Sequence, residues 1–476
     1  MATSVVIHWF RQDLRLQDNP ALTAAAAAGT VVPVYILDDE AAGAWRPGAA
    51  SRWWLHHALL ALNEALDGRL HVFKGCAEQI IPQLGQQQGA AAVFWNRCYE
   101  PWRTEGDRRL KQQLAQLGIG AHSFNGSLLW EPWEILKQDK TPYQVFTPYY
   151  RACLAALTPH PTAAPPVADN FARQVACHGE VSVPELELLP SHPWHEKLAG
   201  HWQPGEAGAH RRLAEFLAQG LYGYAEGRDF PARDQVSRLS AHLHFGELSP
   251  RVLWRQVHRL RDRAPVDVDA YLRELVWREF CYYQLYHVPR LPEQPLRREF
   301  AGFPFRNDRE GLKRWQRGLT GYPLVDAGMR ELWQTGFMHN RVRMVAASFL
   351  VKNQLVSWRQ GADWFLDCLV DADLASNSAG WQWVAGCGLD AAPYFRVFNP
   401  VTQGRKFDPG GDYVRRYVPE LAALPDNYLH APWTAPESVL AAANIRLGVD
   451  YPEPIVDVKT SRERALKAYQ VVRRGL

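Results

Sequence analysis

Glu274 and Trp277 are the first residues whose spacing suggests binding chemistry. They lie three positions apart in YLRELVWREF (271–280), so both would project from the same face of a helix. A carboxylate can accept hydrogen bonds from a heterocycle while an indole stacks on its ring. The pair therefore indicates a site for a planar ligand. The alternative is a helix with one core tryptophan and a surface glutamate.

A second group lies in TGFMHNRVRM (335–344), where Asn340, Arg343 and Met344 occupy positions i, i+3 and i+4. This spacing again puts an amide, a guanidinium and a thioether on one helix face. Such a face can contact a base or a cofactor. The alternative is a helix that runs from the surface into the core.

Hydroxyl and basic groups gather in RDFPARDQVSRLSAHLHFGELSPR, which contains Arg228, Ser237, Arg238 and Ser240. A helix is expected to follow these residues. Hydroxyls, backbone N–H groups and a helix N-terminus together suit a phosphate group. The segment is not a Walker A loop, so by itself it is not a specific sign of a phosphate site.

Two carboxylates, Asp371 and Asp373, stand at the start of DADLASNSAGWQW (371–383). Paired carboxylates suggest general acid–base chemistry or a metal site. No further cluster of hard ligands follows, so no metal is expected here. Arg343 is a candidate partner for Asp371, and a salt bridge would remove that carboxylate from proton transfer.

Short apolar runs alternate with helix-like segments over residues 1–126, the pattern of a parallel sheet with helices on both faces. No GxGxxG motif follows the first run, so this Rossmann-like domain lacks the usual dinucleotide fingerprint. Ser51 is a candidate N-cap for the helix that begins SRWWLHHALL. The expected strands are VVIHWF (5–10), TVVPVYIL (30–37), LHVFKG (70–75), AAVFWN (91–96) and IGAHSF (119–124).

The remaining chain divides into two parts. Residues 127–205 are rich in proline, as in LTPHPTAAPPVADN (157–170), and predict a long connection between domains. Residues 206–476 show helical patterns such as DAYLRELVWREFCYYQLY. We therefore expect an α/β N-terminal domain over 1–126, an interdomain linker, and a large all-α C-terminal domain.

The composition, with 47% hydrophobic and 22% charged residues, is that of an ordinary globular protein. No apolar window is long enough to cross a membrane, and the N-terminus lacks the features of a secretion signal. The seven cysteines are scattered without CxxC spacing. This favours reduced thiols in a cytoplasmic protein without a zinc or iron–sulfur site.

Charge is distributed unevenly along the chain. Residues 1–200 carry 16 Lys+Arg and 19 Asp+Glu, hence a net charge of −3. Residues 201–476 carry 37 and 31, hence +6. A polyanion is therefore expected to bind the C-terminal half. The 19 tryptophans suggest ring stacking or electron transfer in addition to packing.

Several long motifs resemble those of the photolyase/cryptochrome flavoproteins, in the same order and over essentially the whole chain. Within that family the sequence is most similar to the microbial cyclobutane pyrimidine dimer (CPD) photolyases. Besides the segment beginning at Arg228, the motifs are HWFRQDLRLQDNPAL, FTPYYRA, ELVWREF, TGYPLVDAGMREL, GFMHNRVRM, SFLVKNQL, DADLASNSAGWQW and AAPYFRVFNPVTQGRKFDP.

The resemblance implies a light-driven DNA repair enzyme, a carbon–carbon lyase. Its helical domain would hold FAD in a U-shaped conformation. The reduced, anionic flavin would give one electron to a pyrimidine dimer flipped out of UV-damaged DNA, and the electron would return after the ring opens. A lesion that is already poorly stacked costs less to flip, and a basic face would hold the phosphates.

The resemblance also assigns roles to residues that match the family motifs. An Arg343–Asp371 ion pair would lie over the flavin, with Asp373 near its ring edge and Asn377 facing N5. The FAD-binding set is Tyr224, Ser237, Arg238, Leu239, Ser240, Arg343, Asp371, Asp373 and Asn377. The dimer pocket would be lined by Glu274, Trp277, Asn340, Met344 and Trp383. The DNA backbone would be contacted by Arg228, Arg341 and Gln403.

Three positions bear on the lesion and on the choice between repair and signalling. Plant-type cryptochromes tend to have Asp, and animal-type ones Cys, where this chain has Asn377, which favours repair. Relatives that repair (6-4) photoproducts have His residues in the segment where Asn340 and Met344 stand here, which favours cyclobutane dimers.

The alternatives are a cryptochrome-type blue-light receptor, a photolyase for (6-4) or single-stranded lesions, and a redox flavoprotein without a light role. The missing nicotinamide fingerprint weighs against the last, and the missing long C-terminal tail against the receptor.

Trp381 and Trp358 match the proximal and middle members of the three-tryptophan relay that photoreduces the flavin in this family. The distal member normally lies in an FPW segment, but this chain reads FPF and ends it with Phe305. Phenylalanine is much harder to oxidise than tryptophan. We therefore expect slow or rerouted photoreduction, with Trp315 or Tyr322 as substitutes.

The N-terminal domain in this family can hold a light-harvesting antenna chromophore. Folate-binding relatives carry an Asn-Glu pair after the fourth strand, where this chain has Trp102 and Arg103. Arginine cannot accept hydrogen bonds from pterin N–H groups as glutamate does. The usual folate site is therefore not matched, and the antenna identity stays open between another pterin site and a flavin-type chromophore. We also expect a cytoplasmic monomer, nucleoid-associated if bacterial, that binds no metal.

Overall fold

The computed structural model describes residues 4–156, 168–172, 177–394 and 396–474. The chain forms two compact units. The first contains Met1–Tyr222, Ser237–Pro289 and Val370–Ala375, and the second contains Gly223–Val236, Arg290–Leu369 and Ser376–Leu476. Contacts therefore group two segments of the C-terminal half with the N-terminal half. The domain boundaries expected at residues 126 and 205 stay a prediction.

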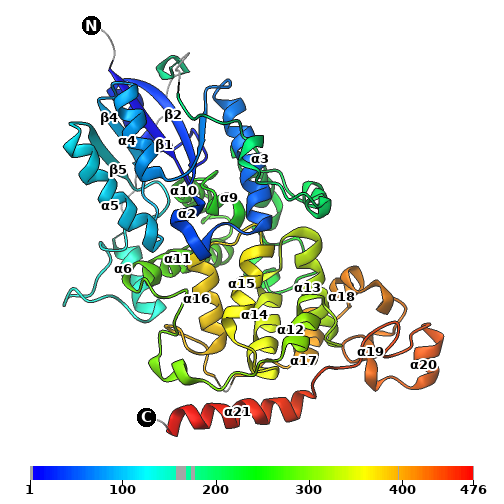
Figure 1. Cartoon of the computed structure of the whole chain (residues 1–476). Coiled ribbons are helices and arrows are strands. Elements are labelled where there is room, and N and C mark those ends of the chain that lie inside the picture. The colour runs from blue at the N-terminus through cyan, green and yellow to red at the C-terminus, as the bar shows by residue number, and fades with distance from the viewer. Residues whose placement is uncertain (1–3, 157–167, 173–176, 395, 475–476) are drawn as a thin grey trace. The chain divides into compact units, whose positions relative to one another are not determined.

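The first unit is built on a five-stranded parallel sheet with the order β3-β2-β1-β4-β5 (Figure 1). All five apolar runs form strands, so the expected α/β class with a parallel, Rossmann-like sheet is confirmed. The strands are β1 (Val5–Phe10), β2 (Thr30–Leu37), β3 (His71–Lys74), β4 (Ala92–Asn96) and β5 (Gly120–Phe124).

Helix α3 (Ala49–Ala65) begins earlier than the sequence suggests. The prediction of Ser51 as its N-cap is wrong, because Gly48 has the extended backbone of a cap and the helix starts right after it. Ser51 instead lies buried inside the first turn. The other helices of this unit are α1 (Pro20–Ala28), α2 (Asp39–Ala42), α4 (Ala77–Gln87), α5 (Pro101–Gln116), α6 (Phe146–Ala155), α7 (Glu206–Glu215), α9 (Ser240–His244), α10 (Pro250–His258) and α11 (Pro265–His287).

Successive strand residues face two separate apolar cores, as the two-residue period of a strand requires. On one face, Val6 and Phe94 pack with residues of α1 and α3. On the other face, Ile7 and Trp95 pack with residues of α4 and α5. Helices therefore cover both faces of the sheet, which explains why the strand sequences are almost continuously apolar.

The expected connection over residues 127–205 contains regular structure. The motif FTPYYRA forms the start of α6, which the low periodicity of the region did not reveal. Residues 157–167 and 173–176, which include most of the proline-rich stretch, lie outside the described part of the chain. Phe171 and Val181 form isolated bridges with strand residues Val31 and Val72, so parts of this connection pack along the sheet.

The second unit is helical, as expected for the C-terminal region. In its described residues the helices are accompanied by one isolated bridge, between Leu447 and Tyr451. Helix α14 continues into a π-helical turn, Phe349–Asn353. The helices are α8 (Tyr224–Gly227), α12 (Arg309–Gln316), α13 (Pro323–Thr335), α14 (Asn340–Ser348), α15 (Trp358–Cys368), α16 (Leu374–Ala385, with its first two residues in the first unit), α17 (Pro400–Phe407), α18 (Asp412–Tyr417), α19 (Asp426–Leu429), α20 (Glu437–Ala442) and α21 (Val458–Arg474).

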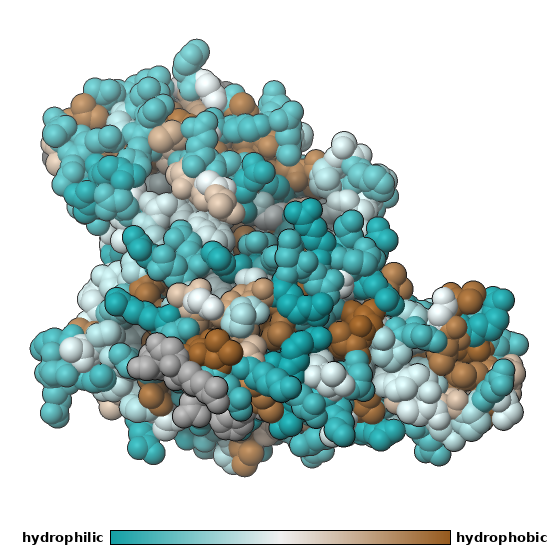
Figure 2. Space-filling model, turned by 60° about the horizontal axis from the view of Figure 1, so that its bottom comes forward, coloured by the Kyte–Doolittle hydropathy of each residue, from teal (hydrophilic) through white to brown (hydrophobic). Residues whose placement is uncertain are grey.

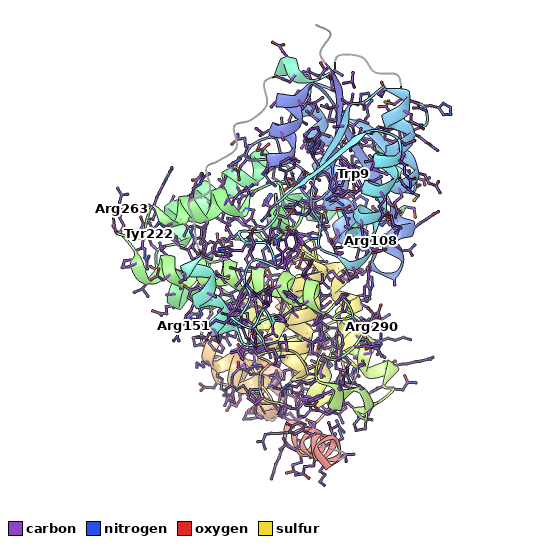
Figure 3. The ribbon with its side chains drawn as sticks, turned by 90° about the vertical axis from the view of Figure 1, so that its left-hand side faces the viewer. Trp9, Arg108, Arg151, Tyr222, Arg263 and Arg290 are labelled. Atoms are coloured by element: carbon purple, nitrogen blue, oxygen red, sulfur yellow. The ribbon has the colours of Figure 1, made fainter. Side chains whose placement is uncertain are left out.

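The face drawn in Figure 2 is mainly hydrophilic, and its apolar residues form small separate groups. Arg108 on α5 and Arg263 after α10 are exposed, and both are labelled in Figure 3. None of the helices in the described ranges combines the length and the apolar composition that a membrane crossing requires.

A buried ion pair lies beside the sheet at the carboxyl ends of β1 and β4. The guanidinium of Arg11 donates to both carboxylate oxygens of Asp107 on α5, at 2.8 and 3.1 Å. The indole N–H of Trp95 donates to the same carboxylate at 2.9 Å. Asp107 thus accepts from both neighbours, and its removal would leave a buried cation without a counter-charge.

We expect Asp107→Ala to lower the free energy of unfolding by about 3–5 kcal/mol, the usual cost of breaking a buried pair. Urea unfolding followed by circular dichroism measures this loss. Glu105→Ala is the matched control on the same helix, because Glu105 is exposed and forms its ion pairs with the surface residues Arg108 and Arg109. Its unfolding midpoint should stay near that of the parent. Equal shifts in both variants would contradict the role given to Asp107.

Candidate functional site

Asp373, expected near the flavin edge, is buried in the first unit just before α16. The hydroxyl of Tyr282 on α11 donates to its carboxylate, and Nδ1 of His244 lies 3.6 Å from it. Burial alone would raise the pKa of Asp373, but His244, Tyr282 and the nearby Arg278 outweigh burial and hold this pKa well below its usual value. The group is therefore a fixed negative charge near neutral pH.

Ser240 and Asp371, both expected to contact FAD, meet in the first unit. The Ser240 hydroxyl at the start of α9 donates to Asp371 Oδ2 at 2.6 Å, across 131 positions of sequence. This bond orients the carboxylate that was expected to pair with Arg343. Arg343 belongs to the second unit, and its ion pair with Asp371 stays a prediction.

The expected phosphate segment is a tight turn that leads into α9. Arg238 has a left-handed backbone with φ +53°, which is uncommon outside glycine. The Ser237 hydroxyl accepts from the N–H of Leu239 at 3.3 Å, and the Ser237 carbonyl accepts from Arg212 at 2.8 Å. Helix α9 contains only 5 residues, so the helix dipole adds little here. A phosphate contact here would therefore have to come from the turn itself, and this contact stays a prediction.

Glu274 and Trp277 lie on α11, and both are half-buried. The Trp277 indole stacks on the ring of Phe146 on α6, with centroids 3.6 Å apart and planes 6° from parallel. Phe146 is fully buried. A rigid aromatic ring therefore backs the indole and fixes its plane. Sequence spacing did not point to Phe146, although it stands in one of the family motifs.

Glu279, also on α11, is a buried carboxylate that ties this helix to the residues after β5. It accepts hydrogen bonds from the N–H groups of Leu129 at 2.8 Å and Trp130 at 3.4 Å, and from Arg278 at 3.0 Å. Burial outweighs these bonds and raises the pKa of Glu279 to about 7. The same helix thus carries a partly protonated carboxyl group and the residues expected to bind the dimer.

Two of the expected DNA contacts gather around Phe407 in the second unit, and the third adjoins them. Arg341 donates to Asp229 at 2.6 Å, and its guanidinium lies 4.4 Å from the centroid of the Phe407 ring. Gln403 and Phe407 are four residues apart on α17, so they share one face of that helix. Arg228 directly precedes Asp229 in the chain. The structure thus brings together cationic and amide groups expected to hold phosphates.

His339 fixes the beginning of α14, which carries Asn340, Arg341, Arg343 and Met344. Its Nδ1 accepts from the backbone N–H of Arg341 at 3.2 Å, while the backbone N–H of His339 donates to the buried Glu331 carboxylate at 3.2 Å. Burial, with the neighbouring arginines, lowers the pKa of His339 to about 4. The imidazole is therefore neutral near pH 7 and serves as a helix cap.

Asn340, Met344 and Trp383 of the expected dimer pocket all belong to the second unit, whereas Glu274 and Trp277 belong to the first. Asn340 is exposed, and Met344 and Trp383 are half-buried. These five residues are accessible enough to meet a ligand. Their gathering around one lesion stays a prediction.

Helices α15 and α16 approach closely because Gly361 has no side chain. A Cβ atom at this position would lie 2.1 Å from the Trp381 ring. Trp381 is buried, and Asn377, one turn earlier, donates from its amide to the Ala362 carbonyl at 3.0 Å. The amide nitrogen carries a second hydrogen, which suits the expected contact with flavin N5.

The aromatic neighbours of Trp381 separate the two candidate relay substitutes. Trp315 is fully buried, and its ring centroid lies 6.2 Å from that of Trp381. The Tyr322 ring instead contacts Phe349 and Trp433, each with centroids 5.1 Å apart. Proximity to Trp381 therefore favours Trp315 as a substitute.

The other relay positions lie in the same unit. Trp358 opens α15 and is buried. Phe305 is half-buried and packs on Phe303, with centroids 4.7 Å apart. The distal position thus contacts another aromatic ring, but phenylalanine occupies it instead of tryptophan.

Tyr224, the remaining expected FAD contact, is buried on α8, and the Arg228 guanidinium lies 5.5 Å from its ring centroid.

In the N-terminal sheet domain, Arg103 lies 3.5 Å from the Cys98 sulfur and 3.8 Å from the Glu100 carboxylate. Arg103 is therefore held by acceptors of its own chain. That the chain lacks the usual folate site stays a prediction.

Comparison with known proteins places these elements in a known context. The family model described as the FAD binding domain of DNA photolyase matches residues 271–471, and the one described as DNA photolyase matches residues 6–167. The chain therefore carries an FAD-binding domain of this type. Most of the residues matched by the FAD-binding model belong to the second unit and to α11.

The similarity to individual proteins extends over the full chain. A protein of Agrobacterium fabrum named deoxyribodipyrimidine photo-lyase is 48% identical, over 100% of this chain and 99% of its own length. Cryptochrome-2 of Arabidopsis thaliana is 39% identical, over 97% of this chain and 78% of its own length. The crystal structure of a bacterial class III photolyase from Agrobacterium tumefaciens matches with a TM-score of 0.96 at 48% identity, over 100% of this chain and 98% of that one.

Glu279 should make the free energy of unfolding depend on pH. Folding raises its pKa from 4.5 to about 7, so between these values the folded state binds more protons than the unfolded state. The free energy of unfolding must then fall as pH rises through this window, by on the order of 3–4 kcal/mol at about 1.4 kcal/mol per pKa unit. Urea unfolding at a series of pH values should show this slope in the parent and a smaller one in Glu279→Gln. Glu310→Gln, which changes an exposed carboxylate, should keep the parental slope. An unchanged slope in Glu279→Gln would contradict the raised pKa.

Proposed function

Since the chain belongs to the photolyase/cryptochrome family, we propose that it repairs cyclobutane pyrimidine dimers in UV-damaged DNA with light energy. FAD, when bound in its reduced form, supplies the photoexcited electron that splits the dimer. The observation that carries the proposal is the Glu274–Trp277 face of α11, with the indole stacked on Phe146. A flat, rigid platform beside a carboxylate suits two stacked pyrimidines.

The donors and acceptors of the chain suit a reduced flavin. Asp373 is a buried carboxylate with a lowered pKa, so it can accept a hydrogen bond from a ring N–H without taking the proton. Asn377 can donate to the flavin without adding charge, which suits an anionic ring better than an aspartate would. Ser240 adds a hydroxyl that suits the polar chain of the cofactor, and it orients Asp371, the carboxylate proposed to pair with Arg343.

The dimer is proposed to enter a pocket between polar and aromatic groups. Glu274 hydrogen-bonds the dimer and stabilises the reduced lesion, while Trp277 and Trp383 stack on its rings. Asn340 and Met344 complete the lining without a proton donor as strong as imidazolium, which favours cyclobutane dimers over (6-4) lesions. Arg228, Arg341 and Gln403 hold the backbone phosphates on either side of the flipped nucleotides.

A second candidate function is blue-light signalling. The 39% identity to Cryptochrome-2 of Arabidopsis thaliana favours it, because that protein carries the cryptochrome name. Asn377 argues for repair, since an amide keeps the flavin site free of an extra ionisable group. The two functions differ in one measurable property, light-dependent recovery of pyrimidines in damaged DNA.

We expect the purified, reduced protein to restore thymine absorbance in dimer-containing duplex DNA under blue or near-UV light. Glu274→Ala should lower the repair rate by roughly ten-fold, because it removes a hydrogen bond to a charged species worth about 1.5 kcal/mol. The flavin absorption spectrum should remain unchanged in this variant. Asp269→Ala removes an exposed carboxylate from the same helix and should repair at the parental rate.

Two outcomes would count against these assignments. No recovery of thymine absorbance in the light would favour the receptor function. Loss of bound flavin from Glu274→Ala would show that Glu274 supports the cofactor rather than the lesion. Parallel assays with (6-4) and single-stranded substrates distinguish the lesion classes.

Photoreduction is proposed to be slow because the relay lacks its distal tryptophan. Hole transfer from Trp381 to Trp315 would leave the charge on a fully buried ring whose N–H donates to the Ala346 carbonyl at 3.0 Å. A charge held in the interior returns readily to the flavin. Repair itself needs only reduced flavin, so it does not depend on this relay.

Phe305→Trp tests the relay. We expect this variant to photoreduce oxidised FAD several-fold faster than the parent, measured by the loss of flavin absorbance under blue light with an external reductant. Trp381→Phe, which removes the first step, should photoreduce more slowly than the parent in either background. If Phe305→Trp is no faster than the parent, position 305 does not limit the reaction.

A further inference from the structure

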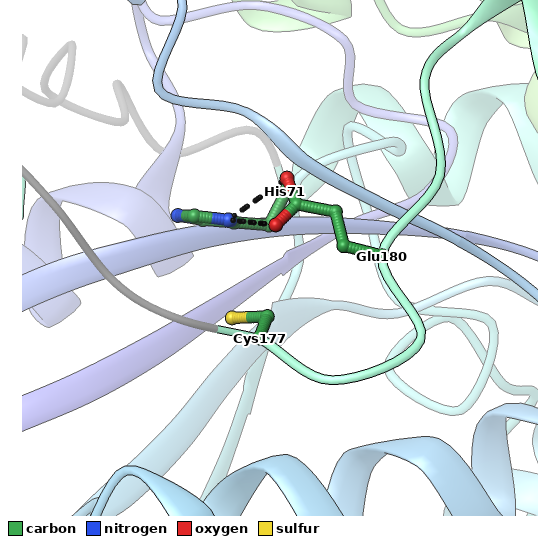
Figure 4. A group of neighbouring side chains, drawn as sticks. All are labelled: His71, Cys177 and Glu180. Carbon is green, nitrogen blue, oxygen red and sulfur yellow. Dashed lines mark hydrogen bonds and ion pairs between the residues drawn. The ribbon is translucent and has the colours of Figure 1, made fainter.

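His71, Cys177 and Glu180 form a side-chain cluster that the proposed flavin and DNA sites do not use. His71 is the first residue of β3, and 109 positions separate it from Glu180. One donor atom from each of the three residues lies within 4.8 Å of the other two. Nδ1 of His71 is 3.1 Å from both carboxylate oxygens of Glu180, and the thiol lies beside them (Figure 4). A nitrogen, a sulfur and an oxygen donor thus converge from two segments.

The backbone around the cluster is fastened to the sheet. β3 is an edge strand, which leaves one row of its backbone groups to be paired by other segments. The N–H of Val181 donates to the carbonyl of Val72 at 2.9 Å, and the N–H of Ala172 donates to the carbonyl of Val31 at 2.9 Å. The side chains of Phe171 and Val183 are buried in the core on one face of the sheet. These anchors place Cys177 and Glu180 over the start of β3 before any ligand binds.

The donor set fits a borderline-soft divalent cation better than calcium or magnesium. Imidazole nitrogen and thiolate sulfur are preferred ligands of Zn²⁺, and a carboxylate oxygen is a common third ligand. In a tetrahedral zinc site the ligand atoms lie roughly 3.2–3.8 Å apart. Donors that already lie within 4.8 Å reach this spacing by small side-chain rotations.

The local electrostatics also favour a cation. The Glu180 carboxylate and a Cys177 thiolate would place two negative charges side by side at this cluster. A divalent ion would compensate both negative charges. The amide of Gln88 lies 3.9 Å from the Cys177 sulfur, at the rim of the same cluster.

We propose that His71, Cys177 and Glu180 bind one zinc ion, with a water molecule as the fourth ligand. The ion fastens residues 177–181 to the edge strand β3 and so shields that edge. On binding, the thiol proton passes to solvent and no electron is transferred. The competing arrangement is a His71–Glu180 ion pair beside a thiol that takes no part.

The first test uses the full-length, FAD-bound protein, stripped with EDTA and then supplied with zinc chloride. Iodoacetamide labelling, read by peptide mass spectrometry, should slow at Cys177 by about ten-fold or more in zinc, because a metal-bound thiolate is a poorer nucleophile. Cys76, another half-buried thiol in the same unit, is the internal control. Its labelling rate should not depend on zinc.

Cobalt(II) provides a second readout, since thiolate ligation in a tetrahedral site gives absorption in the red, where oxidised flavin does not absorb. The bands should appear in the parent and in Cys76→Ser, disappear in Cys177→Ser, and weaken in Glu180→Gln. Glu180 is exposed, whereas Cys177 is half-buried against one apolar core, so circular dichroism checks that Cys177→Ser keeps the parental fold. Zinc that leaves Cys177 labelling unchanged, or cobalt bands that persist in Cys177→Ser, would overturn the proposal.

Discussion

The buried guanidinium of Arg15 holds together parts of the first unit that are far apart in sequence. The side chain is 1% exposed, and it donates to the carbonyl oxygens of Gln17, Asp18, Gly126 and Gly246 at 2.7–3.1 Å. A buried cation is tolerated only when its donors are satisfied. The loop after β1, the residues after β5 and the segment before α10 must therefore keep fixed relative positions. This constraint explains why Ser237–Pro289 forms one compact unit with the sheet.

The same buried polar contacts extend to the proposed cofactor site through α9. The Glu247 carboxylate, after α9, accepts from the Trp54 indole on α3 at 2.9 Å and from the N–H of Gly205 at 2.7 Å. At the two ends of α9, Ser240 contacts Asp371 and His244 contacts Asp373. The orientation of both carboxylates is thus linked to elements that pack on the N-terminal sheet. The proposed electron-transfer site would benefit from this arrangement, because its charges would stay fixed when light is absorbed.

The sequence by itself determined the five strands, the helical character of the C-terminal region and the family. Each of the five apolar runs became a strand, since burial on both faces of a parallel sheet demands nearly continuous apolar residues. The spacing of Glu274 and Trp277 placed both on one helix, and the order of long motifs identified the family. The absence of tryptophan at position 305 is also a property of the sequence alone. These features are local, so periodicity and residue identity were enough to show them.

Only the tertiary structure decided which distant residues meet. No pattern within the sequence links Tyr282 to Asp373, Phe146 to Trp277, or His71 to Cys177. The scattered cysteines gave no sign of the proposed zinc site, because spacing rules detect only ligands that are close in sequence. Such contacts depend on the path of the whole chain and on the need to satisfy buried polar groups. Local patterns carry no information about either, which is why the sequence supplied the elements and the fold supplied their neighbours.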